Sequence, residues 1–227
     1  MLYVLGRGSA NVVAYNLGKP WTLNSGVLKN EFNLRKEVGK RGQGTVPHGL
    51  FFRKDDGAKM YVWNRTEIFE YDLMTPWDVS TAVPSGYFAF ASPVKRGHDI
   101  DIKPDGTVLY IDDRGAGKVF QYNLETPWSV ESAVYDHELD LTKLHRAMRG
   151  IQFSDTGERM FILDTSLKCI FEFRLSEAWM VRSATLAKTL LIDDHFKNPR
   201  GMTWRPDGKA FYVTETADSS IHTYVVP

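Results

Sequence analysis

A turn followed by a short apolar run recurs four times in this chain at nearly equal spacing. The turns are Asp56-Gly57, Asp105-Gly106, Thr156-Gly157 and Asp207-Gly208, so their glycines lie 49, 51 and 51 residues apart. Each turn precedes an aromatic-bearing run, such as Met60-Tyr61-Val62 after the first of them. Regular spacing at this period is typical of repeat architectures, in which each unit buries its faces against its neighbours. We therefore expect an array of similar units.

Two further markers share this period. An aromatic residue two positions before an apolar one occurs at Tyr15, Tyr71, Tyr122, Phe173 and Tyr224, in steps of 56, 51, 51 and 51. A Pro-Trp pair follows at Pro20-Trp21, Pro76-Trp77 and Pro127-Trp128, with a degenerate copy at Ala178-Trp179. Chance does not explain three independent markers with the same period.

Each unit has the pattern of short strands. Apolar residues alternate over runs bounded by Gly, Pro, Asp and Ser, which indicates strands rather than helices. In the second unit we expect strand A at Gly49–Arg53, B at Lys59–Trp63, C at Ile68–Leu73 and D at about Tyr87–Ala91. The Asp-Gly pair supplies the positive φ of a tight hairpin, and the Pro-Trp pair cannot continue the ladder after C.

Four short antiparallel strands repeated at about 50 residues are the signature of a β-propeller blade. We predict an all-β, five-bladed propeller that forms one domain over residues 1–227, with repeats at about 1–45, 46–94, 95–146, 147–197 and 198–227. The first unit begins in strand B and the last ends after strand C, so the expected strand counts are three, four, four, four and three. This pattern does not fit the usual closure by an N-terminal D strand.

Composition excludes some function classes. Lys plus Arg equals Asp plus Glu at 28 each, so no overall field attracts nucleic acid or an anionic membrane, and we predict neither nucleic-acid binding nor membrane insertion. A single cysteine, Cys169, excludes an intrachain disulfide. We predict no cofactor.

One set of repeat-equivalent residues is suited to a ligand. The residue before the Gly or Asp that opens each A strand is His48, His98, Arg149 or Arg200. Propeller geometry places these positions at the mouth of the central channel, where cationic or protonatable side chains suit a carboxylate, a phosphate or an acidic loop. The alternative, which we favour, is that they bond to carbonyl groups of the neighbouring blade and hold blade to blade.

Other candidates have weaker support. The basic, Gly-rich loop Arg35–Gly44 lacks the strand-loop-helix context of a phosphate-binding loop and is interpreted as a lengthened solvated loop. Carboxylates are dispersed near the same face, without compact ligand spacing, and we predict no metal site; they are Asp112, Asp113, Asp164, Asp193, Asp194 and Glu215.

We predict no catalytic residue. No recognisable nucleophile motif accompanies the histidines His137, His145, His195 and His222. Cys169 lies in a predicted strand, where a buried inert thiol is expected. Paired carboxylates for glycoside chemistry stay open, because blades bring distant residues together. The repeated tryptophans are suited to stacking on sugars, but we favour a packing role in which each plugs the C-to-D corner against the next blade.

The residues around the Pro-Trp pairs resemble a known group. Thr75–Ala82 (TPWDVSTA) and Thr126–Ala133 (TPWSVESA), each preceded by Tyr-Asp-Leu or Tyr-Asn-Leu, look like the YDLSTPWDVSTA repeats of β-propeller proteins from tailed bacteriophages and aquatic bacteria. Pro104–Gly106 and Pro206–Gly208 are similar to the wider YVTN and NHL propeller repeats. The resemblance covers nearly the whole chain and implies the fold; it carries over no catalytic residue.

Such propellers serve as virion components, surface adhesion modules and secreted proteins. The resemblance implies a non-enzymatic structural or adhesive component of a tailed bacteriophage virion, in the tail, a fibre or an adaptor. Its partners are then other virion proteins or a host surface receptor, in a symmetric oligomer or a larger assembly. Two alternatives stay open: a secreted or cell-surface carbohydrate-binding propeller, and a propeller hydrolase or lyase.

Overall fold

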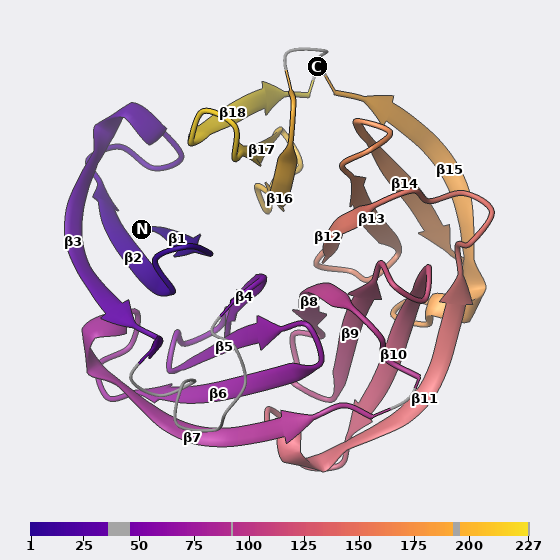
Figure 1. Ribbon diagram of the computed structural model, residues 1–227, viewed down its shortest axis with the longest axis horizontal. Coiled ribbons are helices and arrows are strands. Elements are labelled where there is room, and N and C mark those ends of the chain that lie inside the picture. The colour runs from indigo at the N-terminus through magenta and orange to yellow at the C-terminus, as the bar shows by residue number, and fades with distance from the viewer. Residues whose placement is uncertain (36–45, 92, 193–195, 227) are drawn as a thin grey trace. The chain divides into compact units, whose positions relative to one another are not determined.

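The computed structural model describes residues 1–35, 46–91, 93–192 and 196–226. These residues form antiparallel sheets joined by short turns and single-turn 3-10 helices, and the strand order within each sheet can be followed in Figure 1. The chain groups into two compact units, Met1–Ala89 and Phe90–Pro227.

The first unit contains two sheets, which we call the first and the second. The first sheet has the order β1-β2-β3 and the second the order β4-β5-β6-β7. The strands are β1 (Leu2–Gly6), β2 (Asn11–Leu17), β3 (Gly26–Asn33), β4 (Gly49–Phe52), β5 (Lys59–Asn64), β6 (Glu67–Leu73) and β7 (Ala82–Ala89), and the 3-10 helices are η1 (Leu23–Ser25) and η3 (Val79–Thr81).

The second unit contains the third, fourth and fifth sheets, ordered β8-β9-β10-β11, β12-β13-β14-β15 and β16-β17-β18. The third sheet comprises β8 (Gly97–Ile102), β9 (Val108–Asp113), β10 (Lys118–Leu124) and β11 (Ala133–Asp140), after η4 (Val130–Ser132). The fourth comprises β12 (Met148–Phe153), β13 (Arg159–Asp164), β14 (Cys169–Leu175) and β15 (Ala184–Leu191), after η5 (Val181–Ser183). The fifth comprises β16 (Pro199–Trp204), β17 (Ala210–Glu215) and β18 (Ser220–Val225).

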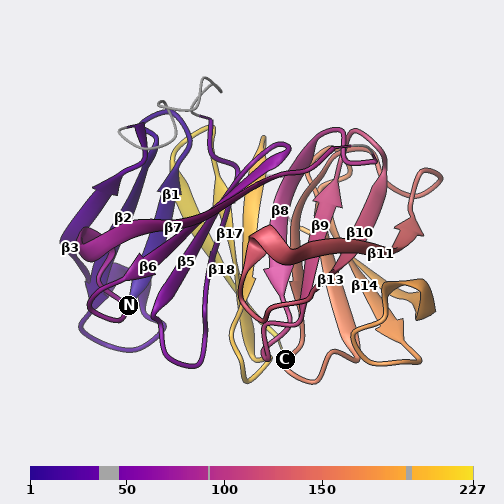
Figure 2. The ribbon, with the colours of Figure 1, turned by 90° about the horizontal axis from the view of Figure 1, so that it is seen from below.

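The predicted all-β architecture is confirmed. In the described residues the five sheets hold three, four, four, four and three strands, so the first sheet lacks an A strand and the fifth a D strand, as expected. Each sheet is twisted, and Figure 2 shows β11 running steeply across β8 and β9 of its own sheet. The prediction of a single domain over residues 1–227 stays a prediction.

The sequence prediction of strand D was wrong at its start. In the second sheet this strand begins at Ala82, directly after η3, and not near Tyr87. Pro84 and Gly86 suggest a loop, but β7 is the outermost strand of its sheet, where a missing N–H or side chain is tolerated. Pro84 pairs with Tyr71 beside a register shift, so the aromatic marker of the repeat coincides with a bulge.

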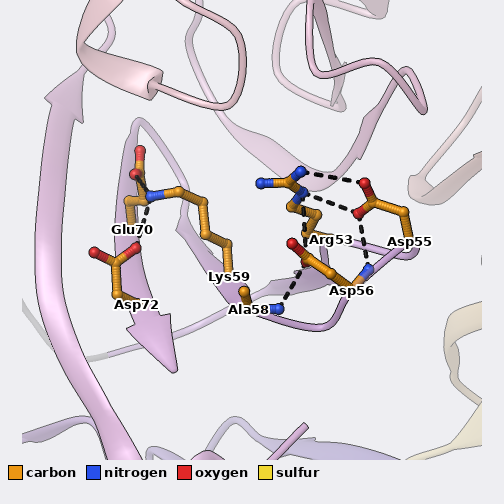
Figure 3. Close-up of polar contacts among 7 residues, drawn as sticks. All are labelled: Arg53, Asp55, Asp56, Ala58, Lys59, Glu70 and Asp72. Carbon is orange, nitrogen blue, oxygen red and sulfur yellow. Dashed lines mark hydrogen bonds and ion pairs between the residues drawn. The ribbon is translucent and has the colours of Figure 1, made fainter. Parts of the chain in front are cut away.

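The turns between the first two strands of the second to fifth sheets have the expected glycine geometry. Gly57 has a φ of +65°, and its N–H donates to the carbonyl of Arg53. Figure 3 shows this turn: Arg53 Nε donates to Asp55 Oδ1 at 2.9 Å, and Asp56 Oδ1 accepts the N–H of Ala58 at 2.9 Å. The hydrogen bond from Arg53 lowers the pKa of Asp55. Arg53 therefore offsets part of the negative charge of this turn.

A second ion-paired group lies on the same sheet. Lys59 Nζ donates to Glu70 Oε1 at 2.5 Å and to Asp72 Oδ1 at 2.7 Å, as Figure 3 shows. Burial opposes the charged form of Lys59, but the bonds and charges of the two carboxylates outweigh it and raise its pKa. The charge of Lys59 is therefore paired with two carboxylates on the neighbouring strand β6 of the same sheet.

Apolar clusters form where neighbouring sheets of one unit pack. In the first unit Val12 and Ala14 of the first sheet contact Met60, Phe69 and Tyr71 of the second, all buried. In the second unit one cluster joins the third and fourth sheets and another joins the fourth and fifth. Burying each such side chain contributes about 1.5–3 kcal/mol, so the blades are stabilised by their neighbours.

Candidate functional site

The four predicted site residues lie at the start of the first strand of the second, third, fourth and fifth sheets. His48 precedes β4, and His98, Arg149 and Arg200 lie on β8, β12 and β16. In the second unit β12 lies beside both β8 and β16. Arg149 Nη1 donates to His98 Nδ1 at 3.4 Å, so the structure brings these two together. In the first unit Arg65 Nε donates to His48 Nε2 at 3.4 Å.

Bulges position three of these side chains, those of His98, Arg149 and Arg200. The register of β8 against β9 shifts between Gly97 and Asp99, which makes His98 the extra residue. The same shift around Arg149 occurs between Met148 and Gly150. In β16 the shift spans Pro199 to Met202 and includes Arg200. A bulge changes the direction in which a side chain points. The positions selected from the repeat therefore coincide with bulges at His98, Arg149 and Arg200.

A carboxylate holds the bulge of β8. Oδ1 of Asp112 accepts the N–H of His98 at 3.0 Å and that of Asp99 at 2.5 Å. In the fifth sheet Thr214 Oγ1 takes this role and accepts the N–H of Gly201 at 2.8 Å. Asp112 is fully buried, and its Oδ2 has no hydrogen-bond partner among the described residues.

Asp99 and Asp112 form an unusual pair of carboxyl groups. Burial raises the pKa of Asp99 to about 8, with a further contribution from the charge of Asp101, against the opposing N–H groups of Ile100 and Ile151. Burial and then the charge of Asp99 raise the pKa of Asp112 well above its usual range. Burial therefore disfavours the charged form of both carboxyl groups.

Sequence reasoning did not single out Asp99. A signal was present, because the other sheets have Gly49, Gly150 and Gly201 where the third sheet has Asp99. A charged residue at a position that elsewhere is glycine marks a departure from the repeat. Structure adds that this carboxylate faces the neighbouring strand, since Asp99 Oδ2 accepts the N–H of Ile151 at 3.4 Å.

The other acidic candidates hold loops together. Each of three carboxylates, at the last residue of β9, β13 and β17, accepts N–H groups from the loop before the sheet and from the turn after the strand. Asp164 accepts from Arg146, Ala147, Ser166 and Leu167. The others are Asp113 and Glu215. We call this recurring arrangement the carboxylate clasp.

The carboxylates and histidines are also possible metal ligands. Within residues 1–35, 46–91, 93–192 and 196–226, no three His, Cys, Asp or Glu side chains are grouped so that they could hold a metal ion. Asp193, Asp194, His195 and most of the loop Arg35–Gly44 lie outside the described residues.

One serine lies beside a histidine that sequence reasoning left without a partner. Ser220 Oγ is 2.8 Å from His222 Nε2, two residues along β18. The same hydroxyl donates to Asp218 Oδ1 at 2.6 Å, in a turn that also includes the N–H of Ser220. A hydroxyl whose proton is given to a carboxylate is not activated by the imidazole, so this group is not a nucleophile–base pair.

The single thiol has the environment expected of an inert residue. Cys169 is buried at the start of β14. Burial, with a smaller contribution from the charge of Asp164, raises the pKa of Cys169 to about 11. Its thiolate fraction is therefore small near neutral pH.

The tryptophans pack within and between sheets. Trp77 has a φ of 64°, its N–H donates to the carbonyl of Gly57, and its ring lies over that glycine. Tyr3 of the first sheet donates to the carbonyl of Trp77 at 2.7 Å. Trp179 repeats these contacts with Gly157 and Tyr110.

The direction of this contact corrects one prediction. We expected each tryptophan to pack against the next blade, but Trp77 and Trp179 contact a tyrosine of the preceding sheet. The reason is that the Pro-Trp segment leads into the outermost strand and crosses toward the earlier neighbour. The packing role that we favoured over sugar stacking accounts for both rings.

Comparisons with known proteins establish the fold of this chain and nothing further. No family model matches the sequence, and no curated protein matches it. Similar solved structures include a protein of unknown function from Desulfotomaculum acetoxidans (11% identity, TM-score 0.53, covering 99% of this chain and 65% of that one). A candidate 6-phosphogluconolactonase from Bacteroides uniformis has 15% identity and a TM-score of 0.56 (98% and 65% covered).

A third similar structure is itself a β-propeller domain. It is the β-propeller domain of Cps50 (Swd1) from Myceliophteria thermophila, with 9% identity, a TM-score of 0.53 and coverage of 96% of this chain and 63% of that one. The fold class is a β-propeller. The chain spans less than two thirds of the length of these solved structures. No helix in the described part of the chain is long and apolar enough to cross a membrane.

Proposed function

We propose that this propeller acts without catalysis, as a structural or adhesive component of a tailed bacteriophage particle. The observation that carries the non-catalytic part is the carboxylate clasp. Asp113, Asp164 and Glu215 accept main-chain N–H groups. These hydrogen bonds hold the loops in place and occupy lone pairs of the carboxylate oxygens. Hydrogen bonds to the carboxylate make it a poor general base or metal ligand.

Two of the charged residues at the starts of the strands also link neighbouring sheets. Arg149 donates to His98, which lies on the neighbouring strand β8. This contact links two neighbouring sheets through side chains, and bonds from these residues to carbonyl groups of the neighbouring blade, which we favoured from the sequence, stay a prediction. A ligand at His48, His98, Arg149 and Arg200 stays a prediction.

The phage assignment is supported by the repeats that resemble YDLSTPWDVSTA, and by the balanced charge, which suits a component that recognises proteins through local surfaces. The proposed location is the virion, and the proposed partners are other virion proteins or a host surface receptor.

Mass spectrometry of purified tailed-phage particles whose genome encodes this chain tests the proposal. Its peptides are expected at a fixed ratio to those of the capsid protein across preparations. Particles that lack these peptides, or contain them in varying trace amounts, would contradict it.

A second candidate function is a hydrolase, because the raised pKa of Asp99 beside Asp112 is what a general acid requires. Similarity to the candidate 6-phosphogluconolactonase makes lactones the class to test. Under our proposal the purified chain hydrolyses a phosphorylated sugar lactone no faster than buffer does. Hydrolysis that Asp99→Asn abolishes, in a variant with unchanged fold, would favour the hydrolase.

A further inference from the structure

Three exposed cationic residues of the second unit occupy equivalent places in the repeat. They are Lys95, Arg146 and Lys197, spaced 51 residues apart in the loops that lead into β8, β12 and β16. The main-chain N–H of each donates to a carboxylate of the clasp, at 2.5 Å for Lys95, 2.6 Å for Arg146 and 2.8 Å for Lys197. Because the clasp uses only the main chain of these residues, it does not determine which side chain stands there.

Further cations lie at the same end of these sheets. Arg96 follows Lys95, and Arg114 lies in the turn after β9. Asp113 accepts the N–H groups of Arg96 and Ala116, so this loop and this turn adjoin. Since β12 lies beside both β8 and β16, the three loops are neighbours. The predicted site residues follow three positions after the exposed cations of the loops; they are His98, Arg149 and Arg200.

The carboxylates at this end do not compensate these cations. Asp113 and Asp164 are fully buried and Glu215 is 3% exposed, and each accepts main-chain N–H groups. The exposed carboxylates Asp140 and Asp218 each accept the hydroxyl of the residue two positions on. Five cationic side chains, which we call the basic face, form no ion pair with a described residue: Lys95, Arg96, Arg114, Arg146 and Lys197.

The other end of the same sheets has a different pattern. There Lys103 pairs with Asp105 at 2.8 Å, and Arg205 pairs with Asp207 at 2.6 Å, in turns between the first two strands. These two cations are offset by an acid of the same turn. A formal net charge of zero is therefore compatible with a locally basic surface, which raises the local concentration of an anionic partner.

The other side chains of these loops narrow the class of partner. Within the described loops and turns at this end, Leu167 is the one large apolar side chain that is exposed, and no aromatic ring is. A stable protein interface needs an apolar or aromatic centre. Single-stranded nucleic acid is held by stacking on aromatic rings. These loops offer neither, so charge and hydrogen bonds are what a partner meets here.

We propose that the basic face binds an anionic polysaccharide of a host cell surface, with carboxylate or phosphate groups repeated along the polymer. The guanidinium groups of Arg96 and Arg146 bind such groups by paired hydrogen bonds, and the lysines add charge. A repeated ligand suits the face because three neighbouring sheets present a cation at the same place. This inference rests on the proposed function as an adhesive component and names the chemistry of the receptor.

A fluorescent oligomer of polygalacturonate is the probe, and its fully methyl-esterified form is the matched neutral control. Anisotropy titration with the full chain is expected to show saturable binding of the charged oligomer, at least about tenfold tighter than of the ester. Because the cations are exposed, raising NaCl from about 0.05 M to about 0.5 M is expected to weaken binding about tenfold. A glycerol-phosphate oligomer of equal charge shows whether phosphate or carboxylate is preferred, and saturable binding of either supports the inference.

Charge reversals locate the contact. Lys95→Glu and Arg146→Glu are each expected to weaken Kd about threefold, and together about tenfold. Lys209→Glu, the same charge change on an exposed residue at the other end, is expected to change Kd less than about 1.5-fold. The reversals leave the main-chain N–H groups of the clasp in place, and thermal melts check that the variants are folded.

Several results would overturn the inference. They are no saturable binding of either oligomer, or binding that Lys95→Glu and Arg146→Glu leave unchanged. Tighter binding of oligothymidylate or polyglutamate of equal charge contradicts it too, because the face then belongs to a nucleic acid or an acidic protein. If both oligomers fail while the chain is a fixed part of phage particles, this inference fails alone; binding by a chain absent from particles removes only the proposed function.

Discussion

Two junctions in the second unit use different chemistry at equivalent positions. Between the third and fourth sheets, Asp101 Oδ2 accepts the N–H of Phe153 at 2.7 Å. Between the fourth and fifth sheets, Gln152 Oε1 accepts the N–H of Trp204 at 2.8 Å. The geometry is conserved by the repeat, but one acceptor belongs to an acidic residue and the other to a neutral amide.

The aromatic contacts differ in the same way. Tyr110 donates its hydroxyl to the carbonyl of Trp179, whereas Phe161, its equivalent on the fourth sheet, stacks on Trp204. The first junction has the Ala178-Trp179 segment to receive that hydroxyl, and the described part of the fifth sheet has no equivalent tryptophan segment. A tyrosine thus occurs where a tryptophan segment offers its carbonyl, and a phenylalanine where the described residues contain no such segment.

The largest expected effect concerns the clasp, which both junctions share. Asp164→Ala removes the acceptor of four main-chain N–H groups at a fully buried site, and we expect a loss of about 3–5 kcal/mol in the free energy of unfolding. Denaturant unfolding measures it. Glu215→Ala, with three N–H donors, is the matched variant, and a loss under about 1 kcal/mol in both would show that the clasp is not structural.

The turn glycines Gly157 and Gly208 differ in what surrounds them. At Gly157, with a φ of 72°, a Cβ would lie 2.3 Å from the ring of Trp179, whereas at Gly208, with a φ of 69°, it would meet nothing within 4 Å. We expect Gly157→Ala to cost about 3 kcal/mol of stability and Gly208→Ala about 1 kcal/mol, the cost of the backbone alone. Equal losses in thermal and denaturant unfolding would remove Trp179 as the cause.

The acidic junction should be sensitive to pH. The folded pKa of Asp99, about 8, lies above its unfolded value, so its contribution to stability is fully present below about pH 4 and is lost as the pH rises toward 8. We expect the wild-type chain to lose about 2 kcal/mol more than Asp99→Asn does between pH 5 and pH 8.

Denaturant midpoints at several pH values measure this difference. The asparagine keeps an oxygen for the N–H of Ile151, so the variant tests charge rather than contact. Parallel curves for the two proteins would show that Asp99 does not titrate in this range.

The smallest expected effect is a single hydrogen bond. Tyr110→Phe removes the bond to the carbonyl of Trp179 and should cost about 1 kcal/mol. Phe161→Tyr, the reverse change at the other junction, should bring no comparable gain, because no described Pro-Trp segment follows the fourth sheet. A matching gain there would mean that the hydroxyl acts independently of its tryptophan partner.

Much of the fold was predictable because turn chemistry is local. The glycines at positive φ, the Pro-Trp breakers and the alternating strands gave the strand pattern of each sheet, including the missing strands of the first and fifth. Prediction failed at β7, where Pro84 and Gly86 suggest a loop but lie on an outermost strand. Whether a breaker is tolerated depends on which neighbours a strand has, and a window of sequence does not contain them.

The candidate site was less predictable. Repeat equivalence identified His98 and Arg149, and structure places them 3.4 Å apart. It treated Asp112 as one of several dispersed loop carboxylates and did not select Asp99, although these two have the most perturbed carboxyl groups. Burial raises the pKa of both carboxyl groups, the charge of Asp101 adds to the shift of Asp99, and the charge of Asp99 adds to that of Asp112. Burial depends on which sheets pack around these strands, and a window of sequence does not show it.

The sequence by itself determined the repeat, the strands of each sheet and the positions where charged residues begin the first strands, since these follow from local backbone preferences and a fixed period. Tertiary structure decided how those residues are used. It placed Asp164 under four N–H groups, paired Asp99 with Asp112 and sent the tryptophans to the preceding sheet. Burial and hydrogen-bond partners belong to the packed sheets, and a side chain acquires them only when its neighbours are in place.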